Sequence, residues 1–508
     1  MSVAAPVLPR TEPELRPAPP APHDGPEARR RPVLDEVRRR WLALVVLCVG
    51  QLMIVLDATV VNVALPSIQR DLHFTPASLA WVVNGYLIAF GGLLLLAGRV
   101  GDLVGRRRVF LGGLALFTAA SVLCGLAPNG GLLIAARFLQ GTGGAAVSAM
   151  VLGILVTLFP SREQTARAMS IYAFVASAGG SIGLLLGGTL TQALSWHWIF
   201  FINLPIGVAA MALGATLIPR HAGIGLHHGL DLLGALLVTA APTLGIYAIL
   251  QASDQGWATS RTLSLGLGTV ALAALFVFVE SRVRNPLVPL RIFGSRTVSG
   301  ANLVRMLFPV GLFGSFYVGA LYLQNVLGYS PLRTGLAFLP QTVSIGLFSL
   351  LIVGRLVRRF GPRATLIPGL LLVSAGLALF SHAPVGGSYL LDVLPVTLLI
   401  GAGAGLVFMP SVALSMSAAG PGDSGVASGL ANVSLQLGAA LGVAVLAGVS
   451  SDHTAALLAA GDPARSALAG GYHLAFAAGS FCLLVAVAVA SVVLRPAARP
   501  RIAVAVAD

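Results

Sequence analysis

The sequence predicts an all-α polytopic membrane protein, and three observations lead to this fold class. The 508 residues are 56% hydrophobic and only 10% charged, with a mean hydropathy of +0.89. A soluble domain of this length could not cover so much apolar side chain with so little charge. The apolar residues also gather in runs long enough to cross a bilayer as helices, and short loops that contain arginine separate these runs.

Fourteen membrane spans are predicted, each long enough for a helix to cross a hydrocarbon core of ~30 Å. The spans cover residues 42–65, 79–98, 109–127, 131–158, 168–192, 198–218, 231–250, 262–280, 298–323, 334–353, 364–380, 391–416, 424–449 and 472–494. Residues 1–40 contain nine prolines, eight arginines and no apolar core, which predicts a disordered tail rather than a signal peptide. Residues 496–508 are the second predicted tail.

The arginines predict the orientation of the protein. All 32 basic residues are arginine, and an even number of spans places both termini on one side. From Arg29 onwards that side carries 24 arginines outside the spans, and the opposite side carries four: Arg70, Arg261, Arg333 and Arg465. Because cytoplasmic loops retain basic residues, we expect both termini to be cytoplasmic and the protein to lie in the cytoplasmic membrane. The basic charge therefore reports topology in a lipid bilayer and not a nucleic-acid partner.

A repeat divides the chain into two similar halves. The sequence GRVGDLVGRRR at residues 98–108 follows the second span, and GRLVRRFGPR at 354–363 follows the tenth. Two adjoining six-span halves would place the copies six spans apart, so an offset of eight means that two extra spans lie between the halves. The predicted units are an N-terminal six-helix bundle, a two-helix insert with its loops and a C-terminal six-helix bundle, at residues 41–220, 221–296 and 297–495. Parallel halves are typical of transporters, which bind substrate where the halves meet.

Asp57 is the only acidic residue that cannot be moved out of the membrane by redrawing a helix end. At about 1.5 Å per residue from Leu42 it lies ~22 Å along its helix. A carboxylate at that depth costs at least a few kcal/mol unless it is paired, hydrated or protonated, and such a residue usually marks a proton or substrate pathway. Arg137 in the fourth span lies at a matching depth, so we expect the two to pair across the cavity. A purely structural ion pair is the alternative.

Several segments together resemble the fourteen-span drug:proton antiporter branch of the major facilitator superfamily, over about residues 41–495. They are LDATVVNVALP (56–66), the loop motif at 98–108, RFLQGTGGAA (137–146), WHWIFFINLPIG (196–207), LYLQNVLGYSPLRTGL (321–336) and SGLANVSLQLGAALG (428–442). The resemblance implies the major facilitator fold, two six-helix bundles with two extra helices between them. The chain departs from the family pattern in its fifth span, where Leu184 stands in place of the proline that usually follows Gly183. The bend of that span is therefore left open.

The resemblance also implies roles for particular residues. Arg137 would tune the Asp57 carboxylate through its protonation cycle. The loop motif would form an ionic latch that is closed when the cavity faces outward, although retention of arginines in the cytoplasm alone also explains its basic residues. The latch comprises Gly98, Asp102, Gly105, Arg106 and Arg107.

Two further sets of residues are candidates from their helical spacing. In the fifth span, Gly180, Gly183, Gly187 and Thr191 fall on one face. These glycines and Gly188 are predicted to form a seam of small residues, which serves close packing, a pliable contact between the halves, or both. A second set predicts an apolar substrate cavity with few polar contacts, although aromatic residues on membrane helices more often serve packing. This set comprises Gln140, Phe313, Tyr317, Gln324, Asn432 and Gln436.

We therefore expect a monomeric, proton-driven exporter of small amphipathic compounds that works by alternating access. Proton-coupled uptake of a metabolite by the same fold stays open, as does a transporter-like sensor or scaffold. We expect no enzymatic activity, and no cofactor beyond the proton gradient. We also expect no metal site, because the three cysteines lie in apolar runs and the closely spaced histidines fall in a loop: Cys48, Cys124, Cys482, His221, His227 and His228.

Overall fold

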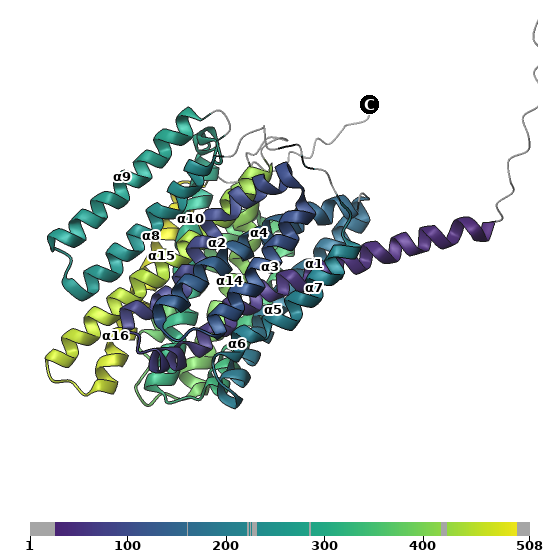
Figure 1. The fold of residues 1–508 in the computed structure, drawn as a ribbon. Coiled ribbons are helices and arrows are strands. Elements are labelled where there is room, and N and C mark those ends of the chain that lie inside the picture. Colours follow the sequence, from purple (N-terminus) through teal and green to yellow (C-terminus); the bar gives the residue numbers. More distant parts are fainter. Residues whose placement is uncertain are drawn as a thin grey trace, which may run out of the picture.

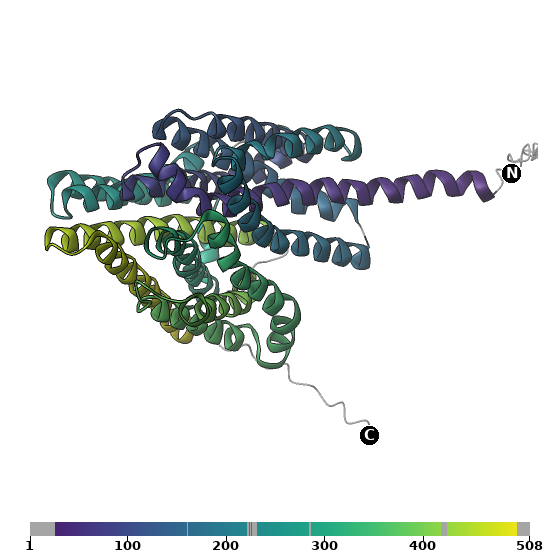
Figure 2. The same cartoon turned by 90° about the horizontal axis from the view of Figure 1, so that it is seen from below.

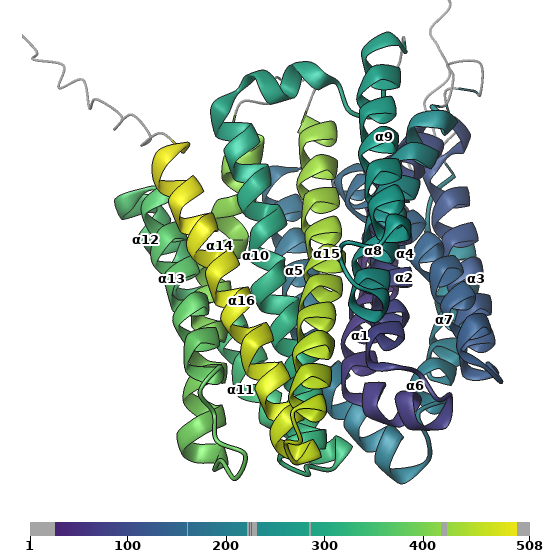
Figure 3. The same cartoon turned by 90° about the vertical axis from the view of Figure 1, so that its left-hand side faces the viewer.

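The structure is a computed structural model that describes residues 26–159, 161–220, 223, 225, 231–283, 286–417 and 424–494. In these residues fourteen helices are long and apolar enough to cross a membrane, which confirms the predicted number of spans. They run roughly side by side as a bundle (Figures 1 and 3). The predicted tail at residues 496–508 and the loop histidines His221, His227 and His228 lie outside the described residues.

The N-terminal half contains α1 (Pro26–Asp71), α2 (Pro76–Val104), α3 (Arg106–Gly125), α4 (Gly130–Leu158), α5 (Arg162–Ala193), α6 (Trp198–Phe201) and α7 (Asn203–Leu217). The insert contains α8 (Leu232–Gln255), α9 (Ser260–Arg282) and the short η2 (Leu290–Gly294). The C-terminal half contains α10 (Arg296–Leu321), η3 (Tyr322–Val326), α11 (Pro331–Leu347), η4 (Phe348–Ile352), α12 (Val353–Phe360), α13 (Pro362–Phe380), η5 (Tyr389–Val393), α14 (Leu394–Met416), α15 (Ser424–Ala459) and α16 (Ala464–Val492).

Capping residues and glycines set the ends of these helices. The Thr75 side chain accepts a hydrogen bond from the Ser78 N–H at the start of α2, and Ser330 caps α11 in the same way. Gly105 ends α2 with φ 110°, and Gly361 ends α12 with φ 87°. Only glycine adopts such angles readily, so the two copies of the repeated motif make the same kind of turn in each half.

Two elements differ from the boundaries that the sequence predicts. Residues 26–40 are helical and continue α1, whereas the sequence predicts a disordered tail there; lengthening an existing helix requires no new nucleus. The predicted span at 198–218 is broken at Ile202 into α6 and α7. At this break the buried Asn203 side chain donates a hydrogen bond to Ser121 Oγ of α3 at 2.9 Å, which gives a polar group at this depth a partner.

The two halves form two layers with the insert beside them (Figure 2). They meet where α5 packs against α11 and where α2 packs against α15. Helix α8 packs against both α2 and α15, so the insert lies over one seam between the halves. Helix α9 packs mainly on α8 at the edge of the molecule, with apolar side chains such as Leu267 and Val270 exposed (Figure 1). Such a face suits contact with lipid.

Candidate functional site

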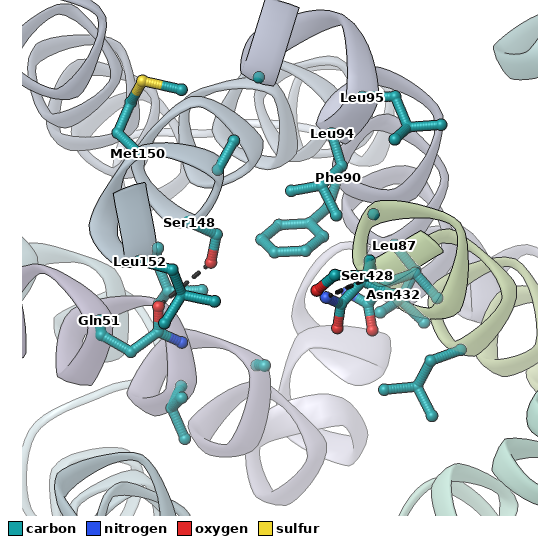
Figure 4. A pocket seen from close by; sticks show the side chains of 18 of the residues that line it. Gln51, Leu87, Phe90, Leu94, Leu95, Ser148, Met150, Leu152, Ser428 and Asn432 are labelled. Atoms are coloured by element: carbon teal, nitrogen blue, oxygen red, sulfur yellow. Dashed lines mark hydrogen bonds between the residues drawn. The ribbon is translucent and has the colours of Figure 1, made fainter. Parts of the chain in front are cut away.

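A cavity of about 1190 Å³ lies between the two halves. Its wall is mainly apolar, with polar groups from α1 and α4 on one side and from α15 on the other (Figure 4). Ser148 Oγ donates a hydrogen bond to Gln51 Oε1 at 3.1 Å, and Asn432 lies opposite them on α15. A large apolar pocket with a few polar groups is typical of a site for small amphipathic molecules.

The cavity extends to the end of the molecule that carries the arginine-rich loops 99–108 and 355–363, which we name the arginine-rich end. Gly98, Arg99, Asp102 and Arg106 line it there. At the opposite end the halves are in contact. Gln324 Nε2 donates a hydrogen bond to the Val63 carbonyl at 2.8 Å, and the Leu332 N–H donates one to Gln192 Oε1 at 3.3 Å. The structure is therefore closed at the opposite end.

Asp57 and Arg137 form an ion pair in which the side chains are 0% and 1% exposed. Arg137 Nη1 lies 2.5 Å from Asp57 Oδ2, and Gln140 Nε2 donates to Asp57 Oδ1 at 2.7 Å. Arg137 also donates from Nε to the Val82 carbonyl at 2.9 Å. Both carboxylate oxygens thus accept hydrogen bonds, an arrangement that suits the ionised carboxylate.

The position of the pair follows from the composition of α4. Gln140 lies one turn after Arg137, so both side chains face α1, and Gln140 continues the network to Ser121 Oγ of α3 at 2.7 Å. Gly141 of the same motif faces α2, and any side chain there would overlap the Tyr86 carbonyl. The motif RFLQGTGGAA therefore supplies the polar groups for Asp57 and the glycine that allows α2 to approach closely.

Tyr86 separates the ion pair from the cavity. Its ring lies 4.5 Å from Arg137 Cζ, which permits a cation–π contact, and it also lines the cavity. Its hydroxyl is buried without a hydrogen-bond partner. Neither Asp57 nor Arg137 lines the cavity, so the two pair inside the N-terminal half and not across the cavity as the sequence suggests.

The structure brings three of the six candidate cavity residues to the cavity wall: Phe313, Asn432 and Gln436. The other three lie elsewhere. Gln140 binds Asp57 inside the N-terminal half, and Gln324 takes part in the closure at the opposite end. Tyr317 is 1% exposed and packs inside the C-terminal half, although it lies only one helical turn from Phe313.

Three residues of the predicted latch, Gly98, Asp102 and Arg106, line the mouth of the cavity, and the charged latch residues bind partners in their own half. Arg106 donates to Asp102 Oδ1 at 3.1 Å and to the Gly153 carbonyl at 3.0 Å. Arg107 donates to the Ala215 carbonyl, and Gly105 makes the turn between α2 and α3. The predicted latch concerns the state that is closed at this end, and its role stays a prediction.

The glycines of α5 face two different helices. Gly183 and Gly187 lie against α1, where a Cβ on Gly187 would come within 2.8 Å of Val60 Cα. Gly188 lies against α11 of the other half, where a Cβ would come within 2.8 Å of Leu332 Cα. Gly180 also faces α11 but has room, with the nearest atom of Thr342 at 3.9 Å. Of these four glycines of α5, only Gly188 makes a tight contact across the halves.

Three buried charged residues were not identified as buried from the sequence. Arg305 of α10 is 2% exposed and donates from Nη1 to Ser411 Oγ at 2.9 Å and from Nε to the Ala431 carbonyl at 2.8 Å. The depth argument used for Asp57 would also have found it. Asp231 lines the cavity, and Glu280 is buried beside it at the ends of the insert helices. Within the described part of the chain, no group of His, Cys, Asp and Glu is arranged to hold a metal ion.

Comparisons with known proteins agree with this architecture. The chain is 42% identical over 423 residues to the puromycin resistance protein pur8 of Streptomyces alboniger, covering 83% of this chain and 84% of that protein. It is 40% identical over 461 residues to the cephamycin export protein CmcT of Amycolatopsis lactamdurans, covering 90% of this chain and 93% of that protein. A solved bacterial homologue of the human lysosomal transporter Spinster shares the fold with a TM-score of 0.65 at 17% identity, covering 90% and 97%. The family model described as Major Facilitator Superfamily matches residues 47–443, and the chain belongs to this family of transporters.

Proposed function

We propose that this protein exports small amphipathic compounds, antibiotics among them, across the cytoplasmic membrane in exchange for protons. The observation that carries the proposal is the buried Asp57–Arg137 pair, separated by the Tyr86 ring from a large and mainly apolar cavity. The similarity to proteins named for puromycin resistance and cephamycin export supports the substrate class and the direction. With the arginine-rich end in the cytoplasm, the cavity is open to substrate from inside the cell.

The pair gives a physical basis for coupling. An ionised Asp57 neutralises Arg137, so in the state with the cavity open to the cytoplasm neither member of this pair is an uncompensated charge. A proton that enters from outside and binds Asp57 removes this compensation. Arg137 is then a buried cation without a counter-charge, which favours rearrangement of the helices around it. Substrate would leave outward in the protonated state, and the proton would leave inward before the next cycle.

The test uses purified protein in lipid vesicles with an imposed pH gradient, in which substrate and proton fluxes are followed together. We expect substrate to move against its gradient only when protons move in the opposite direction. Cells that express the protein should also accumulate less of a fluorescent amphipathic dye than control cells. Greater accumulation of the dye would indicate uptake and overturn the proposed direction.

The orientation makes a separate prediction for cysteines introduced after replacement of the three native ones. His73 is exposed in the loop between α1 and α2, and Val283 is exposed at the other end of the molecule. We expect His73→Cys to react with an impermeant thiol reagent in intact cells, and Val283→Cys to react only after the membrane is permeabilised. The reverse pattern would overturn both the orientation and the export direction.

The latch makes a prediction about the population of states. Asp102→Asn is expected to increase labelling of a cavity cysteine at Ser428 from the cytoplasm, because it weakens closure at that end. In the present state Asp102 binds only the half-exposed Arg106, so the variant loses little stability here. Glu36→Gln is the matched control, since it removes a similar surface ion pair, to Arg40, away from the cavity mouth. Equal labelling of Asp102→Asn and wild type would reject the latch.

A further inference from the structure

The two-helix insert holds two buried carboxyl groups that the proposed function does not use. Asp231 is 7% exposed and Glu280 is 3% exposed. Asp231 caps α8, where its Oδ1 accepts a hydrogen bond from the Gly234 N–H at 2.7 Å. Glu280 lies near the end of α9, and its Oε2 accepts one from the Val288 N–H at 3.2 Å. One oxygen of each carboxyl group is therefore satisfied.

The other two oxygens converge on one place. Asp231 Oδ2 and Glu280 Oε1 are both buried, and neither has a hydrogen-bond partner among the described residues. A Cβ built on Gly234 would lie 2.5 Å from the first and 2.8 Å from the second, so the two oxygens flank the same point. If both carboxyl groups are ionised, both oxygens are acceptors and neither can donate a hydrogen bond to the other. The two negative charges would also repel each other strongly at this separation. A proton on one carboxyl group turns it into a donor and satisfies both.

In the part of the chain that the structure describes, no positive charge takes the place of that proton. Neither carboxyl group forms an ion pair with a described residue, and a small apolar cluster of Ala235, Leu287, Val288 and Leu430 packs beside them. At the arginine-rich end, the charged groups described on the neighbouring elements are Arg99, Asp102 and Arg106 at the cavity mouth, Arg282 on α9, Arg291 on η2 and Arg296 on α10. Arg106 binds Asp102 and Gly153, and Arg282 lies over the Phe278 ring.

We propose that Asp231 and Glu280 form a second proton-binding site, in which the two carboxyl groups share one proton. The site is separate from the Asp57–Arg137 pair and stands whether or not that pair couples transport. Asp231 lines the cavity, as do Pro286 and Leu287 of the segment that Glu280 anchors through Val288. The bound proton thus holds part of the cavity wall at the arginine-rich end.

The sign of the pH dependence follows from the repulsion between the two carboxylates. At low pH the proton is present and the segment at 286–288 stays anchored. As the pH rises the proton is lost, two negative charges face each other, and the contact between Glu280 and Val288 weakens. Leu287, which is buried at 8% exposure, should then become accessible.

Infrared spectroscopy of the full-length protein in lipid tests the site directly, with the proton itself as the ligand. Near neutral pH we expect the C=O stretch of a protonated carboxylic acid in wild type and in Asp57→Asn. The band should be lost in Glu280→Gln, which is isosteric and cannot share a proton. It should shift in Asp231→Asn, which keeps the helix cap but changes the hydrogen-bond partner. Glu163→Gln, at an exposed position on α5, is the control and should keep the band.

A labelling experiment gives an independent readout. As the pH rises, a cysteine at Leu287 is expected to react faster with a thiol reagent. This increase in rate should exceed the increase for the exposed Val283→Cys, which reports the ionisation of the thiol alone. Glu280→Gln should remove this excess. Three results would overturn the proposal. The first is a carboxylic acid band that survives in Glu280→Gln, and the second is the absence of any such band in wild type. The third is an equal pH dependence of labelling at Leu287→Cys with and without Glu280→Gln.

Discussion

Asp57→Asn is expected to abolish proton-driven export and to lower the thermal stability of the protein at the same time. Asparagine cannot exchange a proton, so an imposed pH gradient should no longer concentrate substrate, and the rate should fall to that of empty vesicles. Asparagine also leaves the Arg137 guanidinium buried without a counter-charge. Removing one partner of a buried ion pair costs about 3–5 kcal/mol.

A double variant separates these two effects. In Asp57→Asn with Arg137→Gln both charges are gone, so the melting temperature should recover towards the wild-type value while transport stays absent. Asp57→Glu keeps an acid displaced by one methylene and should retain partial activity. Flux in vesicles and thermal unfolding in detergent provide the two measurements. Wild-type export by Asp57→Asn would mean that the carboxylate is structural and that coupling occurs elsewhere.

The sequence predicts the span number and the buried acid because both depend on local composition. A run of apolar residues forms a helix in a bilayer wherever it occurs, since its backbone groups have no other partners. The depth of Asp57 follows from its distance along one helix. The same argument correctly anticipates that Arg137 lies at the level of Asp57.

The sequence does not predict the burial of a residue, or whether it lines the cavity, where these depend on which helices are neighbours. Phe313 lines the cavity and Tyr317 does not, although helical spacing places them on one side of α10. Asp231 and Glu280 stand at the ends of predicted spans, where a charged residue normally reaches water. They are buried because α8 packs against the two halves and α9 packs on α8, and no local pattern predicts those contacts.

Gly188 is a position at which a single added methyl group should change the balance between states. In the present structure a Cβ there would lie 2.8 Å from both Leu332 Cα and the Pro331 carbonyl oxygen of the other half. Backbone atoms cannot rotate away, and overpacking of this kind costs about 1–3 kcal/mol. This cost falls only on the state that is closed at the end opposite the arginine-rich end. Gly188→Ala should therefore reduce the population of that state by roughly tenfold for each ~1.4 kcal/mol.

Three alanine variants distinguish this effect from a folding defect. Gly180 also faces α11, but a Cβ there would lie 3.9 Å from the nearest atom, so Gly180→Ala should behave as wild type. Gly187→Ala meets Val60 within its own half, so it should lower stability in every state. Gly188→Ala should fold normally, since its contact is between the halves. A cysteine at Asn62, which lines the cavity and is 6% exposed in this state, should label faster from outside, and export should slow. If Gly188→Ala labels and transports like Gly180→Ala, the contact does not control closure at this end.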